Sequence, residues 1–141
     1  MKSQGTRYGF VVRIDPGEEI VAALTELARA RGVRAGLISG LGAVGEVELG
    51  FFVRSTGTYV RRSFSGEHEI LALTGNYSTL EAEPFPHCHI IIAGEDLVAH
   101  GGHLFRGVVT VTCEAQIVTD PGTILRVRRP EQGFNPIEPA D

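Results

Sequence analysis

A single segment of the chain, residues 15–32, has the periodicity of an amphipathic helix, and this scarcity of helix most limits the possible folds. The residues on either side are rich in β-branched and aromatic side chains and in tight turns, so strands dominate the predicted fold. The apolar stripe of the helical segment is formed by Ile20, Leu24, Leu27 and Ala28.

The ends of this helix are also marked. Asp15 can act as the N-cap, Pro16 suits the first helical position, and Glu18 lies where a capping box places its acid. Gly32 follows the last apolar position and predicts the C-terminus. The expected helix therefore starts directly after Asp15 and ends at Gly32.

The predicted fold class is α+β, with a mostly antiparallel, strongly bent sheet and one main helix packed on it, in one domain spanning residues 1–141. A short second helix is expected near residues 78–84. The tail from about residue 130 contains several prolines and is expected to be extended or loosely docked. The predicted strands cover residues 8–14, 46–52, 58–64, 68–77, 86–93, 106–118 and 122–129.

Gly40, Gly42 and Gly45 form a G-x-G-x-x-G pattern, which in nucleotide-binding proteins cradles a phosphate between a strand and a helix. Here residues 46–52 alternate as a strand, and no helix begins inside the pattern. Turns, bulges or close approach of strands are therefore the preferred explanation for these glycines.

Charge and composition narrow the class of protein. The formal net charge is −4, so strong DNA binding is not expected, although this charge does not exclude a local basic patch. The chain has no apolar run of about 18 residues and no signal-peptide pattern, which predicts a cytoplasmic protein. Cys88 and Cys113 fit no disulfide framework and are expected as small core residues.

Four of the five histidines lie in the stretch PHCHIIIAGEDLVAHGGHL, residues 86–104. Side chains alternate along a strand, so His87 and His89 should project to one side and Cys88 to the other. Two neutral imidazoles at this spacing can reach one ion, but they need a further ligand. The pair therefore predicts part of a site for zinc or another divalent transition metal.

His100 and His103 are the candidates for the third ligand. The glycines at 101 and 102 should free the backbone to fold back toward the first two histidines, and His103 precedes an apolar strand start that would hold it rigidly. His103 is therefore the preferred ligand, with His100 as the spare.

Three neutral histidines would leave a dication with a net positive charge and an open position, as in catalytic zinc sites. Glu95 and Asp96 lie in a predicted turn, where acids are common. Glu114 interrupts an apolar strand, and either it or His100 could hydrogen-bond the free nitrogen of a ligand histidine; an exposed glutamate is the equal alternative. No Ser–His or Cys–His nucleophile motif is visible, so no catalytic residue is assigned.

The order of these motifs resembles that of the plants-and-prokaryotes conserved domain family (PPC, also written PCC). The resemblance rests on GLISGLGAVGEVELGFF, GEHEILALTGNYS, PHCHIIIAG and GGHLFRGVVTVTCEAQIV, and extends to about residue 124. It implies an antiparallel sheet of about seven strands, homotrimers, and a metal, usually zinc, held by His87, His89 and His103.

The same resemblance implies a DNA-binding or regulatory role. Plant members read the minor groove with a separate AT-hook centred on Arg-Gly-Arg-Pro. This chain lacks that motif: residues 126–130, RVRRP, have valine in place of the glycine, and their arginines are expected as solvated residues at a strand end.

Two functional hypotheses follow. The first is a trimeric, metal-containing PPC protein that binds DNA or has another regulatory role. The second is a metal-dependent enzyme or small-molecule-binding protein that uses the same histidines. A cupin-like fold also carries H-x-H on a strand, but Glu95 follows one residue too late and the Gly-Gly-His element is not cupin-like. An enclosed metal with an open position and a nearby carboxylate would favour the enzyme.

Overall fold

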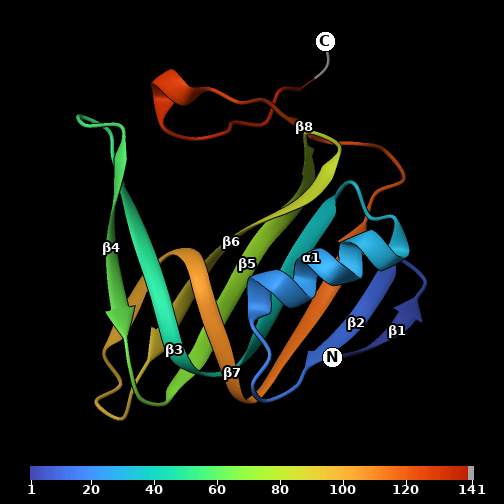
Figure 1. Ribbon diagram of the computed structural model, residues 1–141. Helices are drawn as coiled ribbons and strands as arrows, with labels where there is room; N and C mark the ends of the chain where they lie inside the picture. The colour runs from blue at the N-terminus through green and yellow to red at the C-terminus, as the bar shows by residue number, and fades with distance from the viewer. Residues whose placement is uncertain (140–141) are drawn as a thin grey trace.

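The computed structural model describes residues 1–139, and strands dominate it (Figure 1). The strands are β1 Lys2–Thr6, β2 Gly9–Ile14, β3 Gly36–Val53, β4 Thr58–Phe64, β5 His68–Leu80, β6 Glu83–Ala93, β7 Ala99–Thr119 and β8 Leu125–Arg126. The α-helix α1, Ile20–Arg31, packs against β6 and β7, and a 3-10 helix, η1, covers Pro130–Gln132. The predicted α+β class with a mostly antiparallel sheet and one main helix is confirmed.

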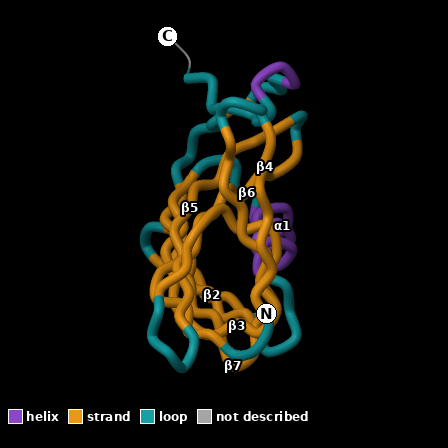
Figure 2. Tube along the Cα trace, turned by 90° about the vertical axis from the view of Figure 1, so that its left-hand side faces the viewer, coloured by secondary structure: helices purple, strands orange, loops and turns teal. Residues whose placement is uncertain are grey.

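The sheet closes on itself through a circuit of antiparallel pairings. β3 pairs with β5, β5 with β6, β6 with β7, and β7 again with β3. The long strands β3 and β7 bend to make this possible, and register shifts along their ladder mark the bulges that allow the bend. Figure 2 shows the strands curving around a common interior, with α1 on one side. The strong bend predicted from the sequence is therefore confirmed.

Aliphatic side chains fill the space between the sheet and α1. Leu24 and Leu27 of α1 are at most 2% exposed, and the Tyr77 hydroxyl of β5 donates to the Leu24 carbonyl oxygen at 2.9 Å. On β6, Cys88 and Ile90 belong to the same core. Because side chains alternate along a strand, His89, which lies between them, must project from the outer face.

The start of α1 differs from the predicted one. Its N-cap is Glu19, whose carboxylate accepts hydrogen bonds from two N–H groups of the first turn at 3.1 and 2.7 Å. Asp15 lies ahead of the helix, and its own N–H donates to Glu18 Oε2 at 2.7 Å. The predictions of Asp15 as N-cap and Pro16 as the first helical residue are therefore wrong, and only the contact from the Asp15 N–H to the Glu18 carboxylate is formed, ahead of the helix. Gly32, in the left-handed conformation at a φ of 65°, ends the helix as predicted.

The glycine-rich pattern lies within β3, so the preference for bulges and close strand approach over a phosphate loop is confirmed. Gly42 has a φ of 151°, and a Cβ there would lie 2.1 Å from the Thr112 carbonyl oxygen. The second helix expected near residues 78–84 is wrong. β5 and β6 are instead joined there by a tight turn at Glu81 and Ala82, which both have positive φ.

The C-terminal residues 125–139 are docked across one end of the sheet, more closely than predicted. β8 pairs in parallel with β5, and the Val127 N–H donates to the Pro136 carbonyl oxygen at 3.1 Å. Further along, the Phe134 ring centre lies 5.4 Å from that of Phe52 on β3. Figure 1 shows this segment crossing from β8 toward the hairpin of β3 and β4. The predicted tail residues 140–141 lie outside the described part of the chain.

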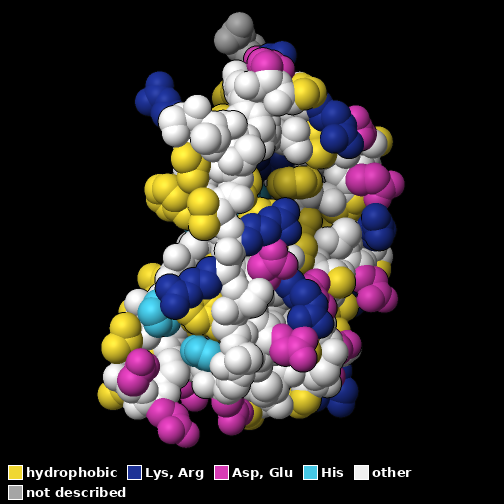
Figure 3. Space-filling model, turned by 60° about the vertical axis from the view of Figure 1, so that its left-hand side comes forward, with side chains coloured by type: hydrophobic (Ala, Val, Ile, Leu, Met, Phe, Trp, Pro, Cys, Tyr) yellow, Lys and Arg dark blue, Asp and Glu magenta, His cyan; other side chains and the backbone are white. Residues whose placement is uncertain are grey.

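The surface carries charges of both signs. On the face shown in Figure 3, Lys and Arg side chains lie among Asp and Glu rather than in one continuous stripe. Within residues 1–139, no helix combines the length and apolar character needed to cross a membrane.

Candidate metal centre

β6 and β7 bring three histidines together on the outer surface of the sheet. His87 and His89 lie on one side of β6, while Cys88 between them is buried in the core, as alternation predicts. His103 on β7 is paired directly with His89. The first half of β6 has only β5 as a neighbour, which accommodates Pro86 without loss of a ladder hydrogen bond on its other side.

The diglycine at residues 101–102 acts differently from the predicted bend. It lies inside β7, and the chain reverses earlier, in a turn at residues 94–97. A Cβ on Gly102 would lie 2.8 Å from the Gly50 carbonyl oxygen, so the glycine lets β7 approach β3 closely. The expected hinge is therefore wrong, although His103 does arrive opposite His89.

The ligand nitrogens of the three rings converge. One nitrogen from each of His87, His89 and His103 lies within 4.8 Å of the other two. His87 Nε2 and His103 Nδ1 are 3.1 Å apart, and the ring centres are 5.0 to 5.6 Å apart. A tetrahedral centre with bonds of about 2.0–2.1 Å places its nitrogens about 3.4 Å apart, so small side-chain rotations suffice. The spacing fits one metal ion.

The surroundings keep two of these rings neutral. Burial lowers the pKa of His87 to about 4, with Arg126 and the other two histidines as further causes. Burial also lowers the pKa of His103 to about 4, helped by His89, Arg61 and Arg126 in that order. Neutral imidazole is the form that binds a metal, so the donor set suits a metal ion at neutral pH.

Tyr59 and Phe105 form an aromatic wall beside His103. Their ring centres lie 5.3 and 4.6 Å from that of His103. Gly50 makes room for both, because a Cβ there would lie 2.3 Å from Phe105 Cε2 and 2.9 Å from Tyr59 Cδ1. The guanidinium carbon of Arg61 lies 3.7 Å from the Phe105 ring centre on the wall's outer side. The wall thus fixes the His103 ring and shields it from water.

The sequence matches the family model of the Plants and Prokaryotes Conserved (PCC) domain over residues 1–120. The chain belongs to the PCC domain family. A candidate DNA-binding protein from Bacteroides thetaiotaomicron is 31% identical to this PCC domain, with a TM-score of 0.93 and coverage of 97% of this chain and 96% of that chain. The family resemblance drawn from the motifs is therefore confirmed.

Two archaeal structures are also similar to this PCC domain. A metal-containing protein from Archaeoglobus fulgidus is 30% identical, with a TM-score of 0.86 and coverage of 99% of this chain and 100% of that chain. A plant- and prokaryote-conserved protein from Pyrococcus horikoshii is 25% identical, with a TM-score of 0.87 and coverage of 99% and 96%. A comparison with curated proteins gives no match.

Beyond the matched residues 1–120, this PCC domain places an arginine against the histidines. Arg126 was expected to be solvated, but it is 9% exposed. Its Nη2 donates to Asn76 Oδ1 at 2.9 Å and lies 3.2 Å from His87 Nδ1. The expectation is wrong for Arg126 and correct for Arg128, which is exposed and paired with Glu81. No pattern in the sequence marks this burial, because the strand that carries Arg126 is only two residues long.

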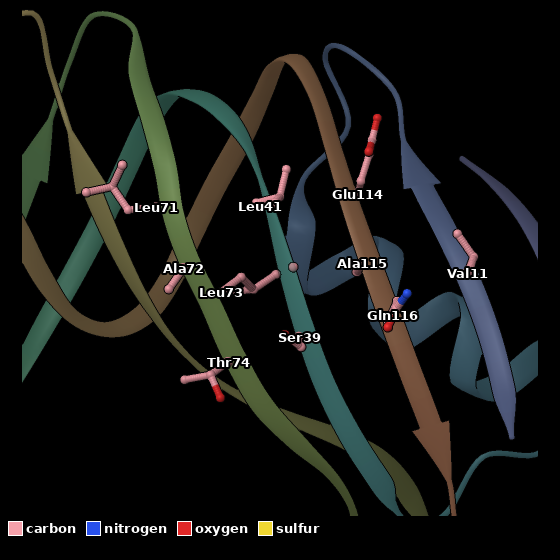
Figure 4. Close-up of a pocket in the computed structure, with 11 residues that line it drawn as sticks. Val11, Ser39, Leu41, Leu71, Ala72, Leu73, Thr74, Glu114, Ala115 and Gln116 are labelled. Atoms are coloured by element: carbon pink, nitrogen blue, oxygen red, sulfur yellow. The ribbon is translucent and has the colours of Figure 1, made fainter.

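The structure leaves His100 and Glu114 outside the histidine cluster. His100 projects from the opposite face of β7 to His103, and its ring centre is 4.9 Å from that of Phe64. Glu114 borders a separate hollow of about 470 Å³ on the outer sheet face, between Leu41, Leu71 and Val11 (Figure 4). Neither residue hydrogen-bonds a ligand histidine within the described chain.

A hollow of about 400 Å³ opens beside the cluster itself. It is open to solvent and combines polar with apolar walls. Its lining consists of Leu37, Thr74, Gly75, Asn76, His87 and His89.

Proposed function

We propose that this PCC domain binds one divalent transition-metal ion, zinc or a chemically similar one, through His87, His89 and His103. The observation that carries the proposal is the convergence of their nitrogens within 4.8 Å. Imidazole suits zinc, copper, iron and nickel, and a relative that is 30% identical is described as metal-containing. When bound, such an ion supplies a Lewis-acidic centre with room for a further ligand.

Elemental analysis of the full chain, purified without chelator, tests this proposal. Wild-type protein should carry about one metal ion per chain, and His89→Ala should lose most of it. His89 is exposed, so its replacement should leave the core intact. His100→Ala is the matched control and should retain the metal, because His100 lies outside the cluster. Metal-free wild-type protein, or equal loss in both variants, would contradict the ligand assignment.

A small molecule is the proposed partner of this metal, ahead of DNA. The hollow beside His87 and His89 supports this choice. A DNA-related regulatory role is the other candidate, because the relative from Bacteroides thetaiotaomicron is described as a candidate DNA-binding protein. Some surface arginines here are paired with acids, as in Arg61–Glu48 at 3.0 Å and Arg106–Glu46 at 2.6 Å, and the net charge is −4. Paired arginines offer little positive charge to phosphates.

The chain is further proposed to form homotrimers, as the family resemblance implies, through the sheet face that points away from α1. Leu37, Leu41 and Leu71 are 64%, 58% and 55% exposed on that face, and exposed apolar patches commonly mark interfaces. Light scattering should give about three times the chain mass of 15.2 kDa. Leu41→Asp combined with Leu71→Asp should lower that mass. A wild-type monomer would contradict the assembly.

A further inference from the structure

Arg126 is a buried cation whose polar contacts are all with uncharged groups. Its Nε donates to Ser78 Oγ at 2.7 Å, and its Nη1 donates to the Asn135 carbonyl oxygen at 2.7 Å. Its Nη2 donates to Asn76 Oδ1 at 2.9 Å and lies 3.2 Å from His87 Nδ1. No carboxylate of residues 1–139 forms an ion pair with this arginine.

The charge of Arg126 therefore lacks a counter-ion inside the described chain. Hydroxyl, amide and carbonyl partners reduce the cost of burying a cation but leave its charge uncompensated. A dication held by neutral imidazoles would add positive charge without bringing any negative charge. An occupied centre would need negative charge from outside residues 1–139.

The hollow beside the cluster lies next to this uncompensated charge. Two of its lining residues, Asn76 and His87, are the same residues that contact Arg126 Nη2. Two other lining residues, Thr74 and Leu37, offer a hydroxyl and an exposed aliphatic side chain. The hollow thus lies behind the two residues that contact Arg126, and it offers a neutral hydroxyl and an apolar contact.

We propose that the ligand of this centre is a small organic carboxylate, whose negative charge is held by the metal and by the field of Arg126. The proposal rests on the metal-binding function above and assigns Arg126 as its specificity-determining residue. A carboxylate carries the missing charge, and a short carbon chain beside it would contact Leu37. A phosphate fits less well, because phosphate sites present clusters of backbone N–H groups or several free Lys and Arg side chains.

Titration of cobalt-loaded full-length protein with lactate tests the proposal. Cobalt reports changes in its coordination through its visible spectrum, and calorimetry gives the affinity. Lactamide is the matched neutral probe, since it has the size of lactate without the charge, and inorganic phosphate is the competing anion. Arg126→Met removes the charge, Arg126→Lys retains it, and Arg128→Met removes an exposed arginine that is paired with Glu81.

Lactate should change the cobalt spectrum of the wild type, whereas lactamide should not. Arg126→Met should weaken lactate binding about tenfold or more, as expected for the loss of one nearby, poorly screened charge, while Arg128→Met should match the wild type. Arg126→Lys should bind lactate more tightly than Arg126→Met. If Arg126→Met does not fold, the comparison of lactate with lactamide on the wild type decides alone.

Three results would overturn this inference without touching the proposed function. Metal-loaded wild-type protein could bind lactamide as tightly as lactate, or bind phosphate more tightly than lactate. Metal-loaded Arg126→Met could also bind lactate as tightly as the wild type does. A chain that takes up no metal would instead overturn the proposed function, and this inference with it. Metal content measured in the same samples distinguishes the two failures.

Discussion

At the scale of single residues, the missing Cβ of Gly50 leaves the room that the aromatic wall beside His103 needs. In Gly50→Ala, the new Cβ would lie 2.3 Å from Phe105 Cε2 and 2.9 Å from Tyr59 Cδ1, so both rings beside His103 must shift. We expect a loss of about 1–3 kcal/mol in the free energy of unfolding, together with weaker metal binding. Denaturant unfolding and metal titration measure the two effects.

The matched control for this variant is Gly94→Ala. The nearest atom to a Cβ at Gly94 is 3.6 Å away, which is ordinary van der Waals contact. Gly94→Ala should leave the free energy of unfolding and the affinity for metal close to those of the wild type. If Gly50→Ala behaves in the same way as Gly94→Ala, the wall has no part in holding His103.

The two cysteines give a second prediction at this scale. Burial raises the pKa of Cys88 to about 12 and that of Cys113 to about 11. Disulfide reagents such as DTNB react with the thiolate, and the raised pKa keeps both thiols protonated at a pH of about 8. The folded protein should therefore not react with DTNB at this pH. The denatured chain should react at both thiols. Rapid labelling of the folded protein would show that the thiols are accessible.

Alternation along β6 is enough to predict from the sequence that His87 and His89 share a face and that Cys88 is buried. The position of Arg126 could not be predicted in the same way. Its burial depends on the pairing of a two-residue strand, β8, with β5, which lies far away in the sequence. A short run with no periodicity of its own contains no signal for such a partner.

At the scale of elements, the bulge in β3 has room only for glycine. Gly42→Ala would combine a φ of 151° with a Cβ 2.1 Å from the Thr112 carbonyl oxygen, and the backbone of β7 cannot rotate away as a side chain can. We expect a destabilisation of more than about 2 kcal/mol, measured as a lower Tm. Gly5→Ala, with no atom within 4 Å, is the control and should be nearly neutral. Equal Tm values for the two variants would contradict this account of the bulge.

The elements also show where patterns in the sequence are ambiguous. The strand-forming runs and the apolar stripe of α1 predict the fold class, because burying one face of a strand or helix requires apolar residues at a regular spacing along the sequence. The start of α1 was misplaced, because Asp15 and Glu18 form a cap-like contact in the approach to the helix and Glu19 takes the cap position. The diglycine was misread because glycine permits a bend and close strand packing equally well, and only the β3–β7 pairing distinguishes them.

At the scale of the whole molecule, the circuit of pairings links the site to the stability of the entire sheet. β6 and β7 carry the three histidines, and both strands also belong to the core under α1. The β6–β7 hairpin places His103 opposite His89, and the pairing of β7 with β3 fixes that hairpin in the closed sheet. A site built on paired strands is held more rigidly than one built on loops, which suits the fixed geometry of a metal.

The distribution of charge over the whole surface gives the last prediction. A net charge of −4, with arginines paired to acids such as Glu46 and Glu48, should allow only weak binding to duplex DNA. Fluorescence anisotropy should detect weak association at about 50 mM salt that is lost at about 200 mM, because the attraction comes from counterion release and not from base contacts. Random and A·T-rich duplexes should behave alike, since the chain lacks an arginine hook for the minor groove. Nanomolar, sequence-selective binding at physiological salt would instead favour the DNA-related role over a small-molecule ligand.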